Sequence, residues 1–262
     1  MNWLDAFEHI AKTHNGFLAV GYNQAYDITN TFYTEGYGYA TFLDSNGQKI
    51  SGVDLSSYIS HAYRINAHNN HYYIAGLSFN AESYVLLKMD STGQVIWNKE
   101  YGGSNSDHCF GMDLSNDGFI FLTGHTLSGT ENWDTYTIKI NFLGDVVWES
   151  KKGNPRGFNP KFIHDEAWDV KAPTDGGCIV VAGTGDEYGN YNRKCGNNGD
   201  NSNTWHVYLI RYNSNGEVVW EKTFGSDEGM DWAGEAIDLT NDGGSIIAVD
   251  DGSFGFLKTS NI

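Results

Sequence analysis

The stretch NDGFIFLTGHTLSGTENWDTYTIKINFLGDVVWESKKG, residues 116–153, sets the pattern for the rest of the chain. A turn at Asp117-Gly118 opens an apolar run, and a polar loop then leads to a run in which apolar and polar residues alternate. A second turn, at Leu143-Gly144, precedes a segment that ends in Trp148. Short runs of this kind between glycine turns are typical of β-strands. The stretch therefore predicts antiparallel strands joined by tight turns.

The same order of turns and strands recurs along the chain. Paired turns, each followed by a tryptophan, stand at Asp175-Gly176 with Asn215-Gly216 and Trp220, and at Asn70 with Thr92-Gly93 and Trp97. In the N-terminal repeat, Ser51 stands where the others have tryptophan. Four strands repeated about every fifty residues are typical of a β-propeller. The sequence thus predicts an all-β fold, a five-bladed β-propeller with four antiparallel strands per blade.

The fifth repeat, which begins at Asp242-Gly243, ends after its third strand. We expect residues 2–4 to supply the missing strand by pairing with residues 254–259, because such closure would remove an exposed sheet edge. No linker interrupts the repeats, so residues 1–262 are expected to form a single domain. A monomer is expected.

Composition agrees with many short strands, since 32 residues are glycine, 3 are proline and 15 % are aromatic. No apolar run is long enough to cross a bilayer. The start, MNWLDAFEHI, lacks the order of a signal peptide, so the protein is either intracellular or its signal lies outside this sequence. The acidic, Asn- and Gly-rich repeats favour an extracellular or cell-surface location.

The formal net charge of −17 argues against binding to nucleic acid or to anionic membranes, because both need a basic face. Six of the sixteen Lys and Arg residues fall in two loops, as Lys151, Lys152, Arg156 and Lys161, and as Arg193 and Lys194. Such a concentration would attract an anionic ligand to one sector of the protein. Arg156 and Arg193 are candidates to bind carboxylate or sulfate groups, although ordinary solvated charge is the alternative.

The three cysteines indicate neither a disulfide framework nor a zinc motif. Cys178 is expected in the core, and a bridge between Cys109 and Cys195 is an open alternative. No cofactor is predicted. A metal held by His61 and His108 stays open, since nothing in their spacing demands one.

The connections differ in length in a way that marks one face of the fold. Both turns within each repeat are short, whereas the other connections are long and irregular, at residues 22–37, 125–135, 153–164, 184–205 and 225–231. Variable loops on a regular scaffold are where binding and catalysis are usually found. Because these loops are unequal, we expect one main site, over the third and fourth repeats.

The first strands of the repeats align as DAFEHI, SHAYRI, DHCFGM, DEAWDV and WAGEAI. Their second positions, expected near the ring axis, are Ala6, His61, His108, Glu166 and Ala233. Two residues on, the same side carries Glu8, Tyr63, Phe110, Trp168 and Glu235. His61, His108, His164 and Glu166 are therefore candidate catalytic groups. The three histidines could equally bind backbone amides between neighbouring repeats. Asp107 and Asp165 recur between repeats and are expected to bind backbone amides.

Two further sets have both functional and structural interpretations. Glu8 and Glu235 would be neighbours in a closed ring, as a pair of catalytic carboxylates or as solvated or ion-paired glutamates. Trp97, Trp148 and Trp220 recur and are expected to pack the scaffold. The non-recurring Trp133, Trp205 and Trp232, with Trp168, are candidate stacking platforms for sugar rings, or loop anchors.

Residues 208–225, YLIRYNSNGEVVWEKTFG, and 84–103, YVLLKMDSTGQVIWNKEYGG, resemble the tryptophan-containing β-propeller repeats of many secreted bacterial and archaeal proteins. The resemblance covers nearly the whole chain and implies the propeller fold. It implies no activity, because such repeats occur in proteins of unrelated roles.

These features lead to a glycan-active protein as the functional hypothesis, with an anionic poly- or oligosaccharide as ligand. As a lyase on a uronic-acid polymer, it would use Arg156 and Arg193 to neutralise the carboxylate, His108 or His164 as base, and a second histidine, Tyr188 or Tyr191 as acid. A hydrolase would use carboxylates such as Glu8, Glu166 and Glu235. A non-catalytic lectin-like module and a scaffold for protein partners are the alternatives.

Overall fold

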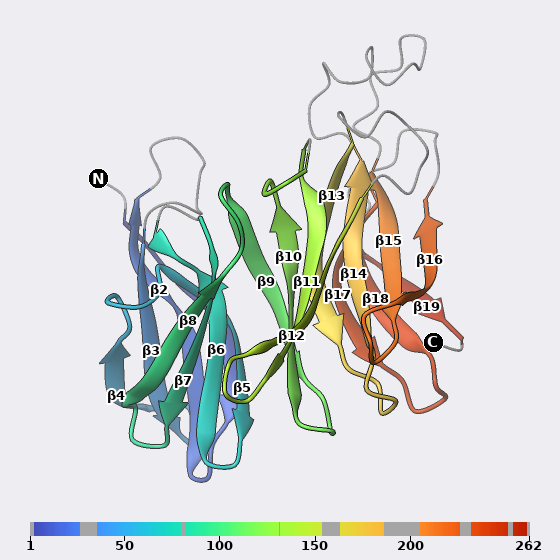
Figure 1. The fold of residues 1–262 in the computed structure, drawn as a ribbon. Helices are drawn as coiled ribbons and strands as arrows, with labels where there is room; N and C mark the ends of the chain where they lie inside the picture. The colour runs from blue at the N-terminus through green and yellow to red at the C-terminus, as the bar shows by residue number, and fades with distance from the viewer. Residues whose placement is uncertain are drawn as a thin grey trace. The chain divides into compact units, whose positions relative to one another are not determined.

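The computed structural model describes residues 3–26, 36–79, 82–130, 132–153, 163–185, 205–225, 232–250 and 254–260. In this part of the chain nineteen β-strands form five antiparallel sheets, four of four strands and one of three (Figure 1). The all-β class is therefore confirmed, and the sheets match the five repeats. The chain divides into two compact units, Met1–Phe110 and Gly111–Ile262.

The first unit contains two sheets in which neighbours in sequence pair with each other. The first sheet comprises β1 (Trp3–Lys12), β2 (Gly16–Tyr26), β3 (Tyr37–Asp44) and β4 (Lys49–Asp54), and the second β5 (His61–His68), β6 (His71–Leu77), β7 (Tyr84–Asp90) and β8 (Val95–Tyr101). Alternate residues of β2, Leu18 and Val20, pack in one core with Ile74 and Leu87 of the second sheet. Because strand side chains alternate between faces, this spacing buries one side of β2 against its neighbour.

The second unit holds the other three sheets. The third sheet comprises β9 (Asp107–Leu114), which begins in the first unit, β10 (Phe119–Thr126), β11 (Asp134–Asn141) and β12 (Val146–Lys152); the fourth β13 (His164–Lys171), β14 (Cys178–Gly185), β15 (Trp205–Tyr212) and β16 (Val218–Phe224); and the fifth β17 (Ala233–Leu239), β18 (Ser245–Asp250) and β19 (Phe254–Thr259). Strand β14 is buried on both faces. Its Val180 packs with Phe121 of the third sheet, and its Val181 with Ile247 of the fifth.

The turns between the third and fourth strands of the four-stranded sheets share one hydrogen-bond scheme. In each, one side-chain oxygen accepts the backbone N–H groups two and four residues later, at 2.8–3.0 Å; the acceptors are Asp44, Asp90, Asn141 and Asn213. The glycine inside each turn has φ between +79° and +94°, a left-handed backbone that favours glycine. These Asx turns explain why Asp/Asn and Gly recur at fixed places in the repeat.

The expected placement of the N-terminal strand needs correction. Trp3 and Leu4 lie in β1, opposite Tyr26 and Ala25 of β2, instead of forming the outer strand of the fifth sheet. A register shift after Leu4 lets β1 extend, which keeps these backbone groups paired within the first sheet. Cys109 is buried, and the bridge considered with Cys195 falls outside the described residues because Cys195 does. Cys178 is buried in the core, as expected.

Candidate functional site

A cluster of polar and aromatic side chains lies at one end of the second unit, where β10 ends and β11 and β13 begin (Figure 1). The antiparallel register places Thr126 opposite Asp134, so the end of β10 and the start of β11 meet. The backbone N–H of Asp165 donates to the carbonyl of Trp133 at 2.8 Å, which joins the start of β13 to them. We call this the β10–β11–β13 site; its members are His125, Trp133, Asp134, His164, Asp165, Glu166 and Trp168.

The aromatic part of the site is built around His125. Its ring is nearly perpendicular to two indoles, with centroid distances of 4.8 Å to Trp133 and 5.9 Å to Trp168. His125 itself is buried, whereas both tryptophans are half-buried. Edge-to-face contacts of this kind fix ring orientation and leave part of each indole open to a ligand.

The acid–base part of the site is centred on His164. The imidazole is buried, and its Nδ1 lies 3.8 Å from Oε1 of the half-buried Glu166. Burial raises the pKa of Asp134 from 3.8 to about 6, against opposing attraction from Lys151 and from His164. His164 therefore interacts electrostatically with two half-buried carboxyl groups, Glu166 and Asp134. The raised pKa leaves Asp134 protonated in part near neutral pH.

Gly153, just after β12, provides the space for two of these carboxylates. A methyl group at this residue would overlap Asp134 Oδ1 and would lie 2.9 Å from Asp165 Oδ2. Both carboxylates therefore lie against the same glycine. Asp165 is fully buried and so cannot contact a ligand. Its role is to position the neighbouring residues of the site.

Asp107 shows the structural role expected for the recurring aspartates. Its Oδ2 accepts the backbone N–H of Gly103 at 2.7 Å, and its carboxylate also lies against Gly102. This arrangement repeats the contact of Asp165 with Gly153. The aspartates at this point of the repeat thus hold the glycine segment that precedes their strand.

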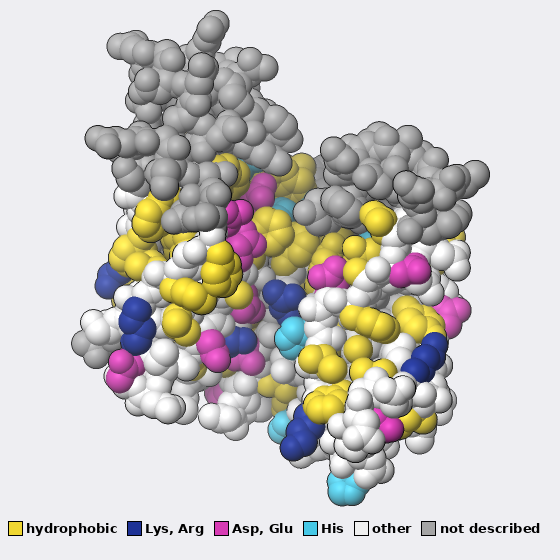
Figure 2. Space-filling view, turned by 180° about the vertical axis from the view of Figure 1, so that it is seen from behind, with side chains coloured by type: hydrophobic (Ala, Val, Ile, Leu, Met, Phe, Trp, Pro, Cys, Tyr) yellow, Lys and Arg dark blue, Asp and Glu magenta, His cyan; other side chains and the backbone are white. Residues whose placement is uncertain are grey.

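Lys151 and Lys152 do not lie in a loop, as the sequence predicted, but form the end of strand β12, where they pair with Tyr136 and Thr135 of β11. Lys151 donates to the carbonyl of Ser128 and lies over the ring of Tyr136 at 5.2 Å. Lys152 forms an ion pair with Glu221 at 3.1 Å. On the face that Figure 2 shows, Lys and Arg side chains are scattered among acidic, apolar and polar ones.

The structure brings together four of the candidate residues named from the sequence, namely Trp133, His164, Glu166 and Trp168. The other two candidate stacking residues, Trp205 and Trp232, pack within the scaffold. Trp205 is buried over Gly183, and Trp232 packs partly buried against the core of the fourth and fifth sheets. Four further candidates, Arg156, Tyr188, Tyr191 and Arg193, lie outside the described residues.

His61 and His108 belong to the first unit and lie in a row of rings. His61 is fully buried; its ring is stacked on Tyr63 at 6.0 Å, and its Nδ1 is 3.1 Å from Ser60 Oγ. Tyr63 contacts Phe110 at 4.9 Å, which in turn meets His108 edge-on at 6.2 Å. The contacts of His61 are thus those of a ring packed among aromatic side chains. His108, at the end of the row, is half-buried.

Sequence reasoning missed Asp134 and His125. Both occupy positions at which the repeats differ, since register places Asp134 where the fourth sheet has His206, and His125 where it has Gly183. Their departure from the repeat was the feature of the sequence that could have singled out these two residues. It could not show that His125 packs against Trp168 or that Asp134 interacts with His164, because Trp168 and His164 belong to another sheet.

Among the described residues, no group of three or more His, Cys, Asp and Glu side chains is arranged to hold a metal ion. No helix in the same residues is long and apolar enough to cross a membrane.

No protein-family model matches the sequence, and no curated protein matches it. A proposed glycoside hydrolase from Parabacteroides distasonis is 9 % identical, with a TM-score of 0.49 over 98 % of this chain and 88 % of that chain. A DUF4221 family member from Bacteroides vulgatus is 11 % identical, with a TM-score of 0.44 over 85 % and 76 %. A mannose phosphorylase from Leishmania mexicana is 9 % identical, with a TM-score of 0.45 over 94 % and 79 %. At these values the similarity transfers no activity to this chain.

Proposed function

We propose that the β10–β11–β13 site binds a glycan and cleaves its glycosidic bonds by hydrolysis. The observation that carries this proposal is a pair of half-buried carboxyl groups, Asp134 and Glu166, that both interact with His164 in a site that also holds two half-buried indoles. Glycoside hydrolysis uses two carboxyl groups, one protonated and one ionised. Indoles suit the apolar face of a sugar ring.

The roles of the two carboxyl groups follow from their surroundings. Asp134, with its pKa raised to about 6, retains a proton in part at neutral pH and protonates the leaving-group oxygen. Glu166 acts as the ionised partner, as base or nucleophile, with His164 beside it. Asp165 and Gly153 position Asp134 without touching the glycan.

A lyase acting on a uronic-acid polymer is the second proposal, because six of the sixteen basic residues cluster in two loops. It would depend on Arg156 and Arg193 to neutralise the uronate, with Tyr188 or Tyr191 available as the acid. Lys151 and Lys152 lie in strand β12 and already make scaffold contacts. Hydrolysis therefore has the larger support in side-chain geometry.

The test is incubation with neutral polymers, xylan and mannan, and with alginate, ulvan, pectate and glucuronan. Release of reducing ends without ultraviolet absorbance from unsaturated ends is the result expected for hydrolysis. Glu166→Gln should abolish release, while Glu100→Gln, at an exposed position on β8, should leave it unchanged. Unsaturated products would replace hydrolysis with the lyase.

Two other outcomes would overturn catalysis altogether. Glycan binding without release, lost in Trp133→Ala and kept in His164→Ala, would make the protein lectin-like. No affinity for any glycan would leave the scaffold for protein partners. A glycan substrate would also suit the extracellular or surface location proposed from composition.

We further propose that the five sheets close into one single-domain, monomeric ring. Each terminal sheet exposes large apolar side chains, Phe7 and Ile10 on β1 and Phe254 and Phe256 on β19. Exposed apolar faces of this kind mark surfaces that are covered in the functional protein.

A further inference from the structure

One position of the repeat differs in the first sheet. The fourth strands of the second, third and fourth sheets carry Trp97, Trp148 and Trp220, each directly opposite a basic residue of the third strand, Lys88, Lys139 and Arg211. In the first sheet the corresponding pair is Ser51 opposite Phe42. Both members of the pair are therefore changed together.

The third sheet shows what the tryptophan normally fills. The Trp148 indole packs between Phe121, at 5.8 Å, and Tyr212 of the fourth sheet, at 5.5 Å. Its Nε1–H donates to the carbonyl of Ser214 at 3.1 Å, in the turn of the next sheet. The indole thus occupies the space between two neighbouring sheets at the end where the tight turns lie.

The basic partner adds charge to the same space. Lys139 Nζ lies 3.9 Å from Asp117 and donates to the Gly176 carbonyl at 2.8 Å. In the fourth sheet, Arg211 pairs with Asp175 at 2.5 Å. The first sheet has Phe42 in place of the cation and Asn15 in the turn that would carry the aspartate. The exchange removes the indole and both charges.

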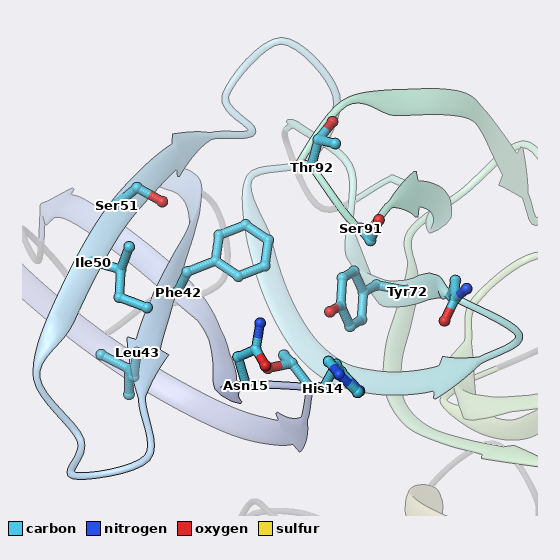
Figure 3. Close-up of a pocket in the computed structure, with 11 residues that line it drawn as sticks. His14, Asn15, Phe42, Leu43, Ile50, Ser51, Tyr72, Ser91 and Thr92 are labelled. Atoms are coloured by element: carbon cyan, nitrogen blue, oxygen red, sulfur yellow. The ribbon is translucent and has the colours of Figure 1, made fainter.

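A cleft of about 730 Å³ lies where this side-chain set is missing, between the first and second sheets (Figure 3). Ser51 stands at its edge, and Ser91, which corresponds in the repeat to Ser214, lines the opposite wall. The rings of Phe42 and Tyr72 both point into it, 6.0 Å apart and edge-to-face. Phe42 fills only part of the vacated space.

We propose that this cleft is a binding site for a neutral sugar ring. Its volume is that of a small-molecule site. None of its eleven lining residues is Asp, Glu, Lys or Arg, so a cationic ligand would gain no compensating charge and an anionic one could find it only at a protonated His14. The walls instead combine two aromatic rings with hydroxyl and amide groups, from Thr13, Asn15, Ser51, Asn70, Ser91 and Thr92.

A pyranose matches this lining in both of its aspects. Its C–H face packs on aromatic rings such as Phe42 and Tyr72, while its hydroxyl groups pair with short polar side chains and with turn carbonyls. The cleft lies within the first unit. Sugar binding in this cleft therefore does not depend on the function proposed for the second unit.

The test restores the repeat's own tryptophan. Binding of cellobiose, mannobiose, galactobiose and digalacturonate is measured by calorimetry in the Trp133→Ala background, so that the second unit does not contribute. At least one neutral disaccharide should bind, and Ser51→Trp should weaken that binding at least tenfold by filling the cleft. Val219→Trp, at an exposed position on β16, is the matched control and should bind as the parent does.

A double variant, Phe42→Lys with Ser51→Trp, copies the third sheet and should abolish binding even if the single variant folds poorly. The proposal is overturned if no neutral disaccharide binds, if folded Ser51→Trp and the double variant bind as well as the parent, or if digalacturonate binds more tightly than every neutral sugar.

Discussion

At the residue scale, Gly153 decides where the carboxylates of the site lie. Its backbone φ is not in the left-handed region, so the requirement for glycine comes from the space that Asp134 and Asp165 occupy. A glycine after a strand is common in this sequence. Only the packing of β11 and β13 around it identifies its role.

Gly153→Ala should lower the free energy of unfolding by about 1–3 kcal/mol, because the added methyl group overlaps Asp134. Combining it with Asp134→Ala should recover much of this loss. Urea denaturation of both single variants and the double variant measures the coupling. If the losses of the two single variants simply added in the double variant, the methyl group of Gly153→Ala would not be in conflict with the Asp134 side chain.

The carboxyl of Asp134 should also make stability depend on pH. Because its folded pKa is raised from 3.8 to about 6, the folded protein holds a proton that the unfolded chain has lost between these values. This group's contribution is therefore present below about pH 4 and is lost as pH rises through 6.

Asp134→Asn should consequently be more stable than the parent at pH 7, by about 1 kcal/mol once solvent screening of the partly exposed carboxyl is allowed for. At pH 4 the advantage should disappear. Thermal unfolding from pH 4 to 8 measures the difference. If the stability advantage of Asp134→Asn grew toward low pH, the pKa of Asp134 would be lowered in the folded protein, not raised.

At the element scale, the strands and their turns could be predicted from sequence because the information is local. The Asp/Asn and Gly pairs mark turns whose Asx hydrogen bonds involve residues only two and four positions apart. Alternation in β2 likewise predicts its buried face. The pairing of Trp3 and Leu4 could not be read in this way, because it depends on a register shift in β1.

Asp90→Ala should lower the melting temperature by roughly 2–4 °C, because the turn loses side-chain hydrogen bonds to Thr92 and Gln94. Asp90→Asn is the matched control, since Asn141 and Asn213 make the same turn. It should cost less than half as much. Equal losses in the two variants would assign the effect to charge instead of turn geometry.

At the scale of the whole molecule, the repeat predicted the five sheets and the four strands of the first four. In the described part of the chain, the fifth sheet has three strands instead of the predicted four, because Trp3 and Leu4 pair with β2. Of the candidate residues that the sequence named, His164, Glu166, Trp133 and Trp168 lie together in the β10–β11–β13 site. Asp134 and the cleft beside Ser51 needed the structure, because each arises where side chains of separate strands meet. The sequence showed Ser51 as an exception without showing the space it leaves.

Ring closure predicts that Phe256 on β19 is covered in the full-length protein. Phe256→Ser should then cost about 2–3 kcal/mol of unfolding free energy, whereas a bare surface position would cost under about 0.5 kcal/mol. Val219→Ser, also exposed in its own sheet, is the control in urea denaturation. Equal small losses, or a dimer in sedimentation that Phe256→Ser dissociates, would contradict closure by this chain's own N-terminal sheet.

The most direct test of the proposed acid–base chemistry is the pH dependence of kcat/KM on whichever glycan the protein cleaves. The proposal predicts a profile whose alkaline limb falls with an apparent pKa near 6, from Asp134. Asp134→Asn should lower kcat/KM at least a hundredfold and remove the alkaline limb. Unchanged turnover and an unchanged profile in Asp134→Asn would contradict the assignment of this site as the catalytic centre.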